Sequence, residues 1–143
     1  MNTIVMNTLT GAVTEYDNFG FQSITPTHAG NATGLFLLGG DTDITAPILS
    51  DVLTGKQIMD AAQRKRIPNI YFAIEGPSDA TCVVATEDTE YEYGFVVRAD
   101  GLSRADPGKG IIENYLQTGL KTSGEGFTLD YIEANVAVTA RRI

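Results

Sequence analysis

The second half of the chain alternates apolar and polar residues with a period of two. In residues 91–98, Tyr, Tyr, Phe and Val occupy the odd positions, whereas the charged residues occupy even positions. Residues 70–74 place isoleucine and phenylalanine on even positions in the same way, and Cys82 and Val84 share one face of the next segment. This period predicts β-strands that bury one face and expose the other.

The first half of the chain predicts shorter strands. Four segments combine apolar or aromatic residues with flanking turn signals: 12–16, 19–24, 33–38 and 48–53. The segment 33–38 is a continuous apolar run that Gly39 and Gly40 stop. A short apolar run between turn signals is typical of a fully buried strand.

One segment has helical spacing. Residues 55–66 place Ile58, Met59 and Ala62 on one stripe and end in three basic residues, which suit the C-terminus of a helix. Pro68 would end such a helix. The sequence therefore predicts at most one short helix.

The apolar series near the C-terminus changes phase once. Phe127, Leu129 and Tyr131 occupy one face, but the series then resumes at Ile132. A slip of one residue moves every following side chain to the opposite face, so we expect a β-bulge or a change of sheet at Tyr131–Ile132. With roughly eight to ten short strands, the pattern predicts an all-β fold, a β-sandwich or jelly roll. Residues 1–143 are predicted to form a single sandwich domain.

The charge of the chain is unevenly distributed. The net charge is −8 and the pI is about 4.4, yet residues 1–55 contain no Lys or Arg. An acidic surface repels phosphate backbones, so we expect no nucleic-acid partner.

No apolar run approaches the ~18 residues of a membrane span, so we expect no membrane partner. The N-terminus lacks the basic and apolar regions of a secretory signal, which predicts synthesis in a cytoplasm.

The chain carries few of the residue types that catalysis needs. It has one histidine, His28, one cysteine, Cys82, and no tryptophan. A zinc site of the usual Cys/His kind is therefore out of reach, and Cys82 lies in an apolar strand where a free thiol behaves as a buried hydrophobe. We predict no catalytic residue and no cofactor. A hydrolase that uses an unrecognised pair among the eighteen carboxylates is the enzymatic alternative.

Asp41 and Asp43 are the best candidates for metal ligands. They lie two residues apart in the glycine-containing segment 39–43, as in calcium loops. Calcium takes about six to eight oxygen ligands, however, and no glutamate follows at the EF-hand spacing. Capping of turns by the aspartates is therefore the preferred interpretation, and we predict no metal. The loop 106–110 looks like a phosphate-binding loop, but it lacks the Ser or Thr that should follow Lys109.

Four segments resemble those of small virion proteins of tailed bacteriophages. They are DNFGFQSITPTHAG at 17–30, GGDTD at 39–43, PGKGIIENY at 107–115 and FTLDYIE at 127–133. The resemblance implies a non-enzymatic structural component of the virion, made in the host cytoplasm and assembled as a homo-oligomer in the tail, tail-tip or adaptor region. The implied partners are other copies of this chain and neighbouring virion proteins.

Two alternatives stay open beside this interpretation. A capsid decoration protein would have the same chemistry at another place on the particle. A carbohydrate-binding jelly roll for host attachment would need an exposed aromatic or calcium-bearing face. In an assembly protein we expect strand edges and the loops 26–34 and 99–110 to order against a neighbour. The basic residues Arg141 and Arg142 have two interpretations, a frayed solvated end and a contact with an acidic neighbour, and the first is preferred.

Overall fold

The computed structural model describes residues 3–16, 19–43, 45–58 and 63–139. The fold is all-β and sandwich-like, with 58% strand and no helix among the described residues, so the predicted fold class is confirmed. The chain divides into two compact units, Met1–Gly40 and Asp41–Ile143. A single domain over residues 1–143 stays a prediction.

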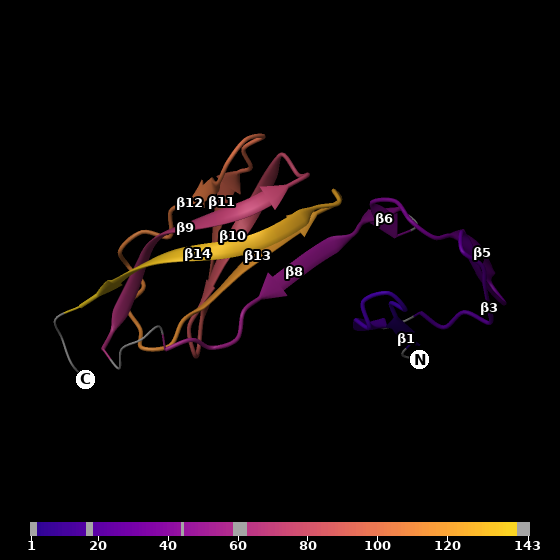
Figure 1. Ribbon diagram of the computed structural model, residues 1–143, viewed down its shortest axis with the longest axis horizontal. Coiled ribbons are helices and arrows are strands. Elements are labelled where there is room, and N and C mark those ends of the chain that lie inside the picture. Colours follow the sequence, from indigo (N-terminus) through magenta and orange to yellow (C-terminus); the bar gives the residue numbers. More distant parts are fainter. Residues whose placement is uncertain (1–2, 17–18, 44, 59–62, 140–143) are drawn as a thin grey trace. The chain divides into compact units, whose positions relative to one another are not determined.

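The C-terminal unit contains two antiparallel sheets (Figure 1). One has four strands in the order β11-β10-β13-β8, and the other has three in the order β12-β9-β14. The strands are β8 (Leu49–Leu53), β9 (Lys65–Glu75), β10 (Asp79–Ala85), β11 (Glu90–Val96), β12 (Ser103–Ala105), β13 (Gln117–Ser123) and β14 (Thr128–Val138). A small hairpin, β6 (Thr42–Asp43) with β7 (Ala46–Pro47), precedes them.

The core lies between these two sheets. Ile70, Phe72 and Ile74 of β9 are buried, as the period of two predicts, and they share one cluster with Cys82 of β10. Phe72 stacks on Phe95 of the other sheet, with ring centroids 4.8 Å apart and planes at 13°. The alternating apolar positions of β9 and of β10 point toward each other between the two sheets and form this core.

The predicted phase slip in the last strand is present, one residue earlier than expected. Leu129 pairs with Ile74 and Tyr131 with Ala73, so the ladder shifts between Leu129 and Tyr131. Tyr131 consequently lies on the outer face and is 49% exposed, whereas Ile132 packs against the core. The prediction that Tyr131 shares the face of Leu129 is wrong, because the extra residue precedes the tyrosine.

A second register shift separates Asn135 from Ala137 on β14. Across the ladder, Asn135 pairs with Asn69 and Ala137 with Arg66, so two residues of β9 oppose one residue of β14. One of these two is Pro68, which has no N–H to donate to a ladder and is tolerated where a strand bulges. The shift also explains how Ile67 and Ile70 can both be buried.

The predicted helix over 55–66 is wrong for the part that the structure describes. Gln57 forms an isolated bridge with Leu116, and Lys65 and Arg66 open β9; residues 59–62 lie outside the described ranges. The apolar stripe was short, and tertiary pairing overrides a marginal helical preference. Lys65 is fully buried and its Nζ donates to the carbonyl of Asn114 at 3.1 Å.

The described residues of the N-terminal unit form five short strands. They are the hairpin β1 (Thr3–Met6) with β2 (Val13–Tyr16), and the sheet β3 (Ser23–Ile24), β4 (His28–Asn31) and β5 (Gly34–Leu37). Strands within 12–16 and 33–38 are confirmed, whereas the strand predicted at 19–24 is reduced to Ser23–Ile24. The expected burial of 33–38 is wrong, because Leu35 and Leu37 are 74% and 70% exposed. No second layer of this unit covers that face of β5 among the described residues.

Candidate functional site

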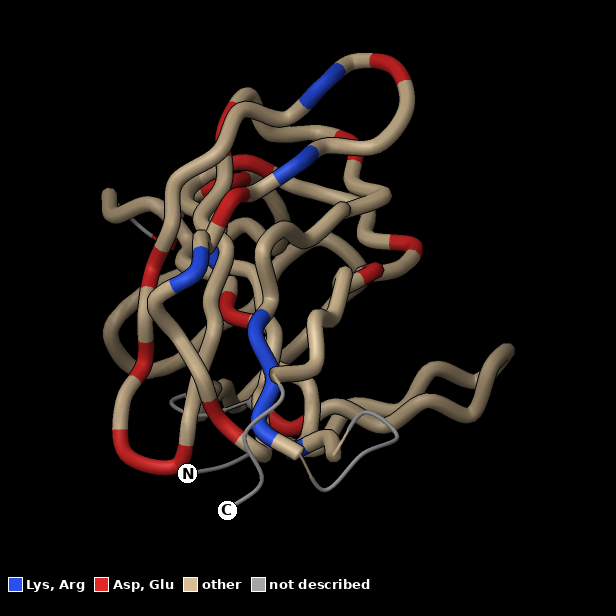
Figure 2. The backbone as a smooth tube through the Cα atoms, turned by 90° about the vertical axis from the view of Figure 1, so that its left-hand side faces the viewer, with Lys and Arg blue, Asp and Glu red and all other residues tan. Residues whose placement is uncertain are grey.

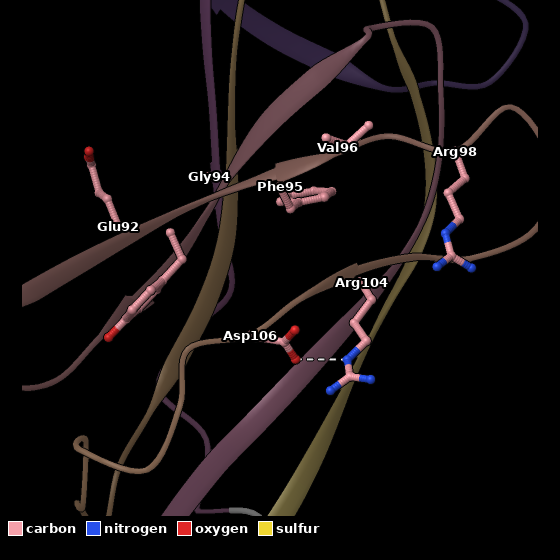
Figure 3. A pocket seen from close by; sticks show the side chains of 8 residues that line it. Glu92, Gly94, Phe95, Val96, Arg98, Arg104 and Asp106 are labelled. Atoms are coloured by element: carbon pink, nitrogen blue, oxygen red, sulfur yellow. Dashed lines mark hydrogen bonds and ion pairs between the residues drawn. The ribbon is translucent and has the colours of Figure 1, made fainter.

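A cavity of about 580 Å³ lies at one flank of the sandwich, where the edge strands of the two sheets come together. Its lining residues come from β11 and from β12 with the segments that follow each strand (Figure 3): Glu92, Tyr93, Gly94, Phe95, Val96, Arg98, Arg104 and Asp106. The lining of the cavity therefore includes two guanidinium groups, although the chain as a whole has a net charge of −8. We call this cavity the flank cavity.

Local structure holds the two arginines on the same side of the flank cavity (Figure 3). The N–H of Arg98 donates to the hydroxyl of the buried Ser103 at 2.9 Å, which ties the end of β11 to the start of β12. Arg104 follows on β12, and its Nε donates to Asp106 at 2.7 Å. The Arg98 guanidinium has no ion-pair or hydrogen-bond partner among the described residues. Such a planar group binds carboxylates and phosphates through two parallel hydrogen bonds.

The backbone of β11 also faces the flank cavity with unpaired groups. Val97 donates its N–H to Ser78 on the β10 side at 3.1 Å. In an antiparallel ladder, alternate residues direct both main-chain groups to the same neighbour. The residues that bond to β10 are therefore the odd-numbered ones, and the N–H and C=O groups of Glu92, Gly94 and Val96 point away from β10. No described strand pairs with them on that side.

Lys121 engages the acidic residues on the outer face of the four-stranded sheet. Its Nζ lies 2.7 Å from Glu92, 3.9 Å from Asp51 and in hydrogen-bond contact with Glu90. Hydrogen bonds to Glu90 and Glu92 raise the pKa of Lys121 above its ordinary value, so the ammonium stays charged. The carboxylate of Glu92 is paired with the ammonium of Lys121, so it does not neutralise the guanidinium of Arg98. Acidic positions are otherwise spread along the chain (Figure 2).

Burial controls the titratable groups near the core. Cys82 is completely buried, and desolvation raises the pKa of its thiol to about 12, so it behaves as the predicted inert hydrophobe. Desolvation also raises the pKa of Tyr93, with smaller contributions from Tyr91 and Cys82. Both groups remain protonated at neutral pH, and neither provides an ionised nucleophile.

The predicted metal candidates lie apart from the flank cavity's lining. Asp41 and Asp43 are exposed next to or within β6, and their carbonyls accept the N–H groups of Ile48 (3.0 Å) and Thr45 (2.7 Å). Within the described ranges, no three His, Cys, Asp or Glu residues gather as metal ligands. The preference for turn capping over metal binding at this pair stays a prediction. His28 lies on β4, with its Nδ1 2.9 Å from the Thr27 hydroxyl.

Two further sequence features can be placed. The 106–110 loop is fixed by a hydrogen bond from Gly108 N–H to the carbonyl of Pro68, at 3.3 Å. The Arg141–Arg142 pair, with its two interpretations, lies outside the described residues.

A second exposed feature belongs to the N-terminal unit. Eight of its large apolar side chains are exposed: Ile4, Val5, Met6, Leu9, Val13, Ile24, Leu35 and Leu37. These residues lie on both faces of their strands, because Ile4, Val5 and Met6 are consecutive on β1, and we call the set the N-terminal apolar surface. Only Ala29 is a buried hydrophobic residue among the described part of the unit. The unit is further held by a small aromatic group, in which Phe21 contacts Phe19 (4.5 Å between centroids) and Phe36 (5.6 Å).

Sequence reasoning missed the flank cavity. Arg98 was visible only as the end of an alternating strand, and Arg104 as part of a charged loop. The available signal was their separation by a short turn that contains Asp100-Gly101, which returns the chain on itself. Gly101 takes a φ of 78°, as such a turn requires.

Among the described residues, no helix is long and apolar enough to cross a membrane. The chain matches no protein-family model, no curated protein and no solved structure.

Proposed function

We propose that this protein is a non-enzymatic assembly subunit that associates with other copies of itself through its N-terminal apolar surface. The observation that carries this proposal is the exposure of eight large apolar side chains in a unit with almost no core of its own. A two-stranded hairpin and a three-stranded sheet of this size gain little stability alone. Burial against a partner would stabilise the unit by about 1.5–3 kcal/mol for each large side chain that becomes fully buried.

The charge distribution favours another copy of the chain as the partner. Residues 1–40 contain two acidic residues and no Lys or Arg, for a net charge of −2, which leaves −6 for residues 41–143. Two N-terminal units can approach each other with little repulsion. Apart from β2, which carries Glu15, the described strands of this unit have no charged residue, so they lack the usual protection against association. Closed symmetric homo-oligomers are the common outcome of such self-complementary surfaces.

We place this subunit in the virion of a tailed phage, in the tail, tail-tip or adaptor region. The support for that location is the resemblance of the segments 17–30, 39–43, 107–115 and 127–133 to virion proteins. An apolar surface that needs a neighbour fits a subunit that is ordered by assembly.

Light scattering coupled to size-exclusion chromatography tests the association. The wild-type chain should elute as an oligomer at micromolar concentration and dissociate on dilution. Substitution of Leu35 and Leu37 by Ser should shift it to the monomer while the far-ultraviolet circular dichroism stays β-rich. Leu49→Ser is the matched control, because Leu49 is 77% exposed on β8 and lies outside the N-terminal unit. A wild-type chain that is monomeric at all concentrations would refute the proposal.

The location has its own test. Mass spectrometry of purified particles of the phage that encodes the chain should detect it at a fixed copy number, and electron microscopy should place it. Absence from intact particles would overturn the virion assignment and leave the association unaffected.

A further inference from the structure

The flank cavity combines an open strand edge with an unpartnered cation. Glu92, Gly94 and Val96 direct main-chain donors and acceptors into the space where a further strand would lie. Arg98 and Arg104 lie at the same cavity with their guanidinium groups on one side (Figure 3). This geometry is separate from the N-terminal apolar surface, since the two features share no residue.

We propose that the flank cavity binds an extended acidic peptide, which adds to the edge of β11 as a strand and places a carboxylate on Arg98 and Arg104. Main-chain hydrogen bonds along an exposed edge give such a site its affinity, and pockets for side chains give it its specificity. Here the specificity comes from the guanidinium groups, which match a carboxylate through paired hydrogen bonds.

Charge selects the occupant. Asp106 already accepts one hydrogen bond from Arg104, and Glu92 is engaged by Lys121, so Arg98 provides the uncompensated charge. A basic or neutral segment would leave Arg98 without a partner on binding. An acidic segment would pair with the exposed guanidinium of Arg98, next to the half-buried Tyr93 of the cavity lining.

Gly94 gives the inference a sharp test. It lies at the centre of the open edge, and a Cβ at this position would meet no atom within 4 Å. Gly94→Ala should therefore bind the peptide as the wild type does. Gly94→Pro removes the outward N–H but leaves every hydrogen bond to β10 in place, because the Gly94 N–H does not face β10. It should abolish strand addition.

The probe is a fluorescein-labelled, end-capped peptide of sequence Thr-Val-Thr-Glu-Val-Thr, and its twin with Gln in place of Glu is the comparison. Fluorescence anisotropy with the full chain at low ionic strength should show the Gln twin binding about tenfold more weakly, as expected for the loss of a charge-assisted pair. Arg98→Gln should weaken the Glu peptide by a similar factor and leave the Gln twin unchanged. Lys109→Gln removes the same charge outside the cavity and should change neither.

Four results would overturn the proposal: equal binding of the two peptides, no binding at millimolar concentration, an unchanged affinity in Arg98→Gln, or an unchanged affinity in Gly94→Pro. If Gly94→Pro fails to fold, amide exchange of the labelled wild type replaces it, and the Glu92, Gly94 and Val96 amides should become protected by the Glu peptide, and by the Gln twin only at about tenfold higher concentration. A wild-type oligomer that Gly94→Pro dissociates, but that the Leu35/Leu37 double variant keeps, would assign the edge to a second copy of the chain instead.

Discussion

Replacing Gly119 by alanine should destabilise the C-terminal unit, although glycine is usually an unfavourable residue in a strand. Gly119 lies within β13, paired with Val83 on one side and with Leu53 on the other. A Cβ at this position would collide with the carbonyl oxygen of Val52 and lie 2.9 Å from Leu53 Cδ1 and 3.2 Å from Leu53 Cα. Backbone atoms cannot rotate away, so β8 itself would have to move.

Two opposing effects set the magnitude. Removing a glycine from a strand stabilises a protein by about 0.5–1 kcal/mol, through the lower entropy of the unfolded chain. Forcing extra atoms into a packed position costs about 1–3 kcal/mol. The contact with backbone places Gly119→Ala at the upper end of that cost, so we expect a net loss of about 2 kcal/mol. Gly94→Ala has the same gain without the clash, and should be neutral or more stable by up to about 1 kcal/mol.

Urea unfolding followed by circular dichroism near 218 nm measures both variants, at one low protein concentration because association changes apparent stability. The unfolding midpoint should fall for Gly119→Ala and stay or rise for Gly94→Ala. Equal midpoints for Gly119→Ala and the wild type would mean that β8 is not held as closely as the contacts indicate. Equal destabilisation by both substitutions would refute the role of close approach.

Three further predictions concern the core and the acidic face. Native Cys82 should react with Ellman's reagent only as fast as the protein opens, and rapid labelling of the native protein would contradict its burial. Because burial raises the pKa of the folded-state thiol above its unfolded value, the stability of the protein should hold below pH 9 and fall as the pH rises toward about 12. Lys121→Gln should lower the melting temperature at low ionic strength, because three carboxylates lose the cation that they share. Added salt should reduce the difference in melting temperature from the wild type, and a difference that does not depend on salt would indicate a packing effect instead. A double-mutant cycle with Phe72→Leu and Phe95→Leu should give a coupling free energy of about 0.5–1.5 kcal/mol for the stacked rings, and strict additivity would argue against contact between the two sheets.

Alternation predicted most strands of the C-terminal unit, but not β12, which lies in a predicted loop, nor the start of β9, which lies in the predicted helix. Ile70, Phe72 and Ile74 could be placed in the core from their spacing alone, because a strand that buries one face repeats every two residues. The phase slip near Tyr131 was readable for the same reason, although its position was off by one residue. A sequence shows that a ladder must shift, but the partner strand decides where the extra residue lies.

Features set by contacts far apart in the sequence could not be predicted. The apolar run at 33–38 has the composition of a buried strand, but burial depends on a second layer, which composition does not reveal. Lys65 carried the signal of a helix end, yet its ammonium is buried against the carbonyl of Asn114, 49 residues away. The flank cavity has the same origin, since Arg98 and Arg104 gain their common position only when the edges of two sheets meet.

The first register shift of β14 has a consequence for solubility. This strand is eleven residues long and lies at the edge of its sheet, so its outer main-chain groups could template the addition of another chain. The extra residue between Leu129 and Tyr131 interrupts the regular spacing of these main-chain groups, and the carboxylates of Asp130 and Glu133 add charge near the break. An incoming chain could match only a few residues before losing alignment, so this long edge resists amyloid-like stacking even though no neighbouring strand covers it among the described residues.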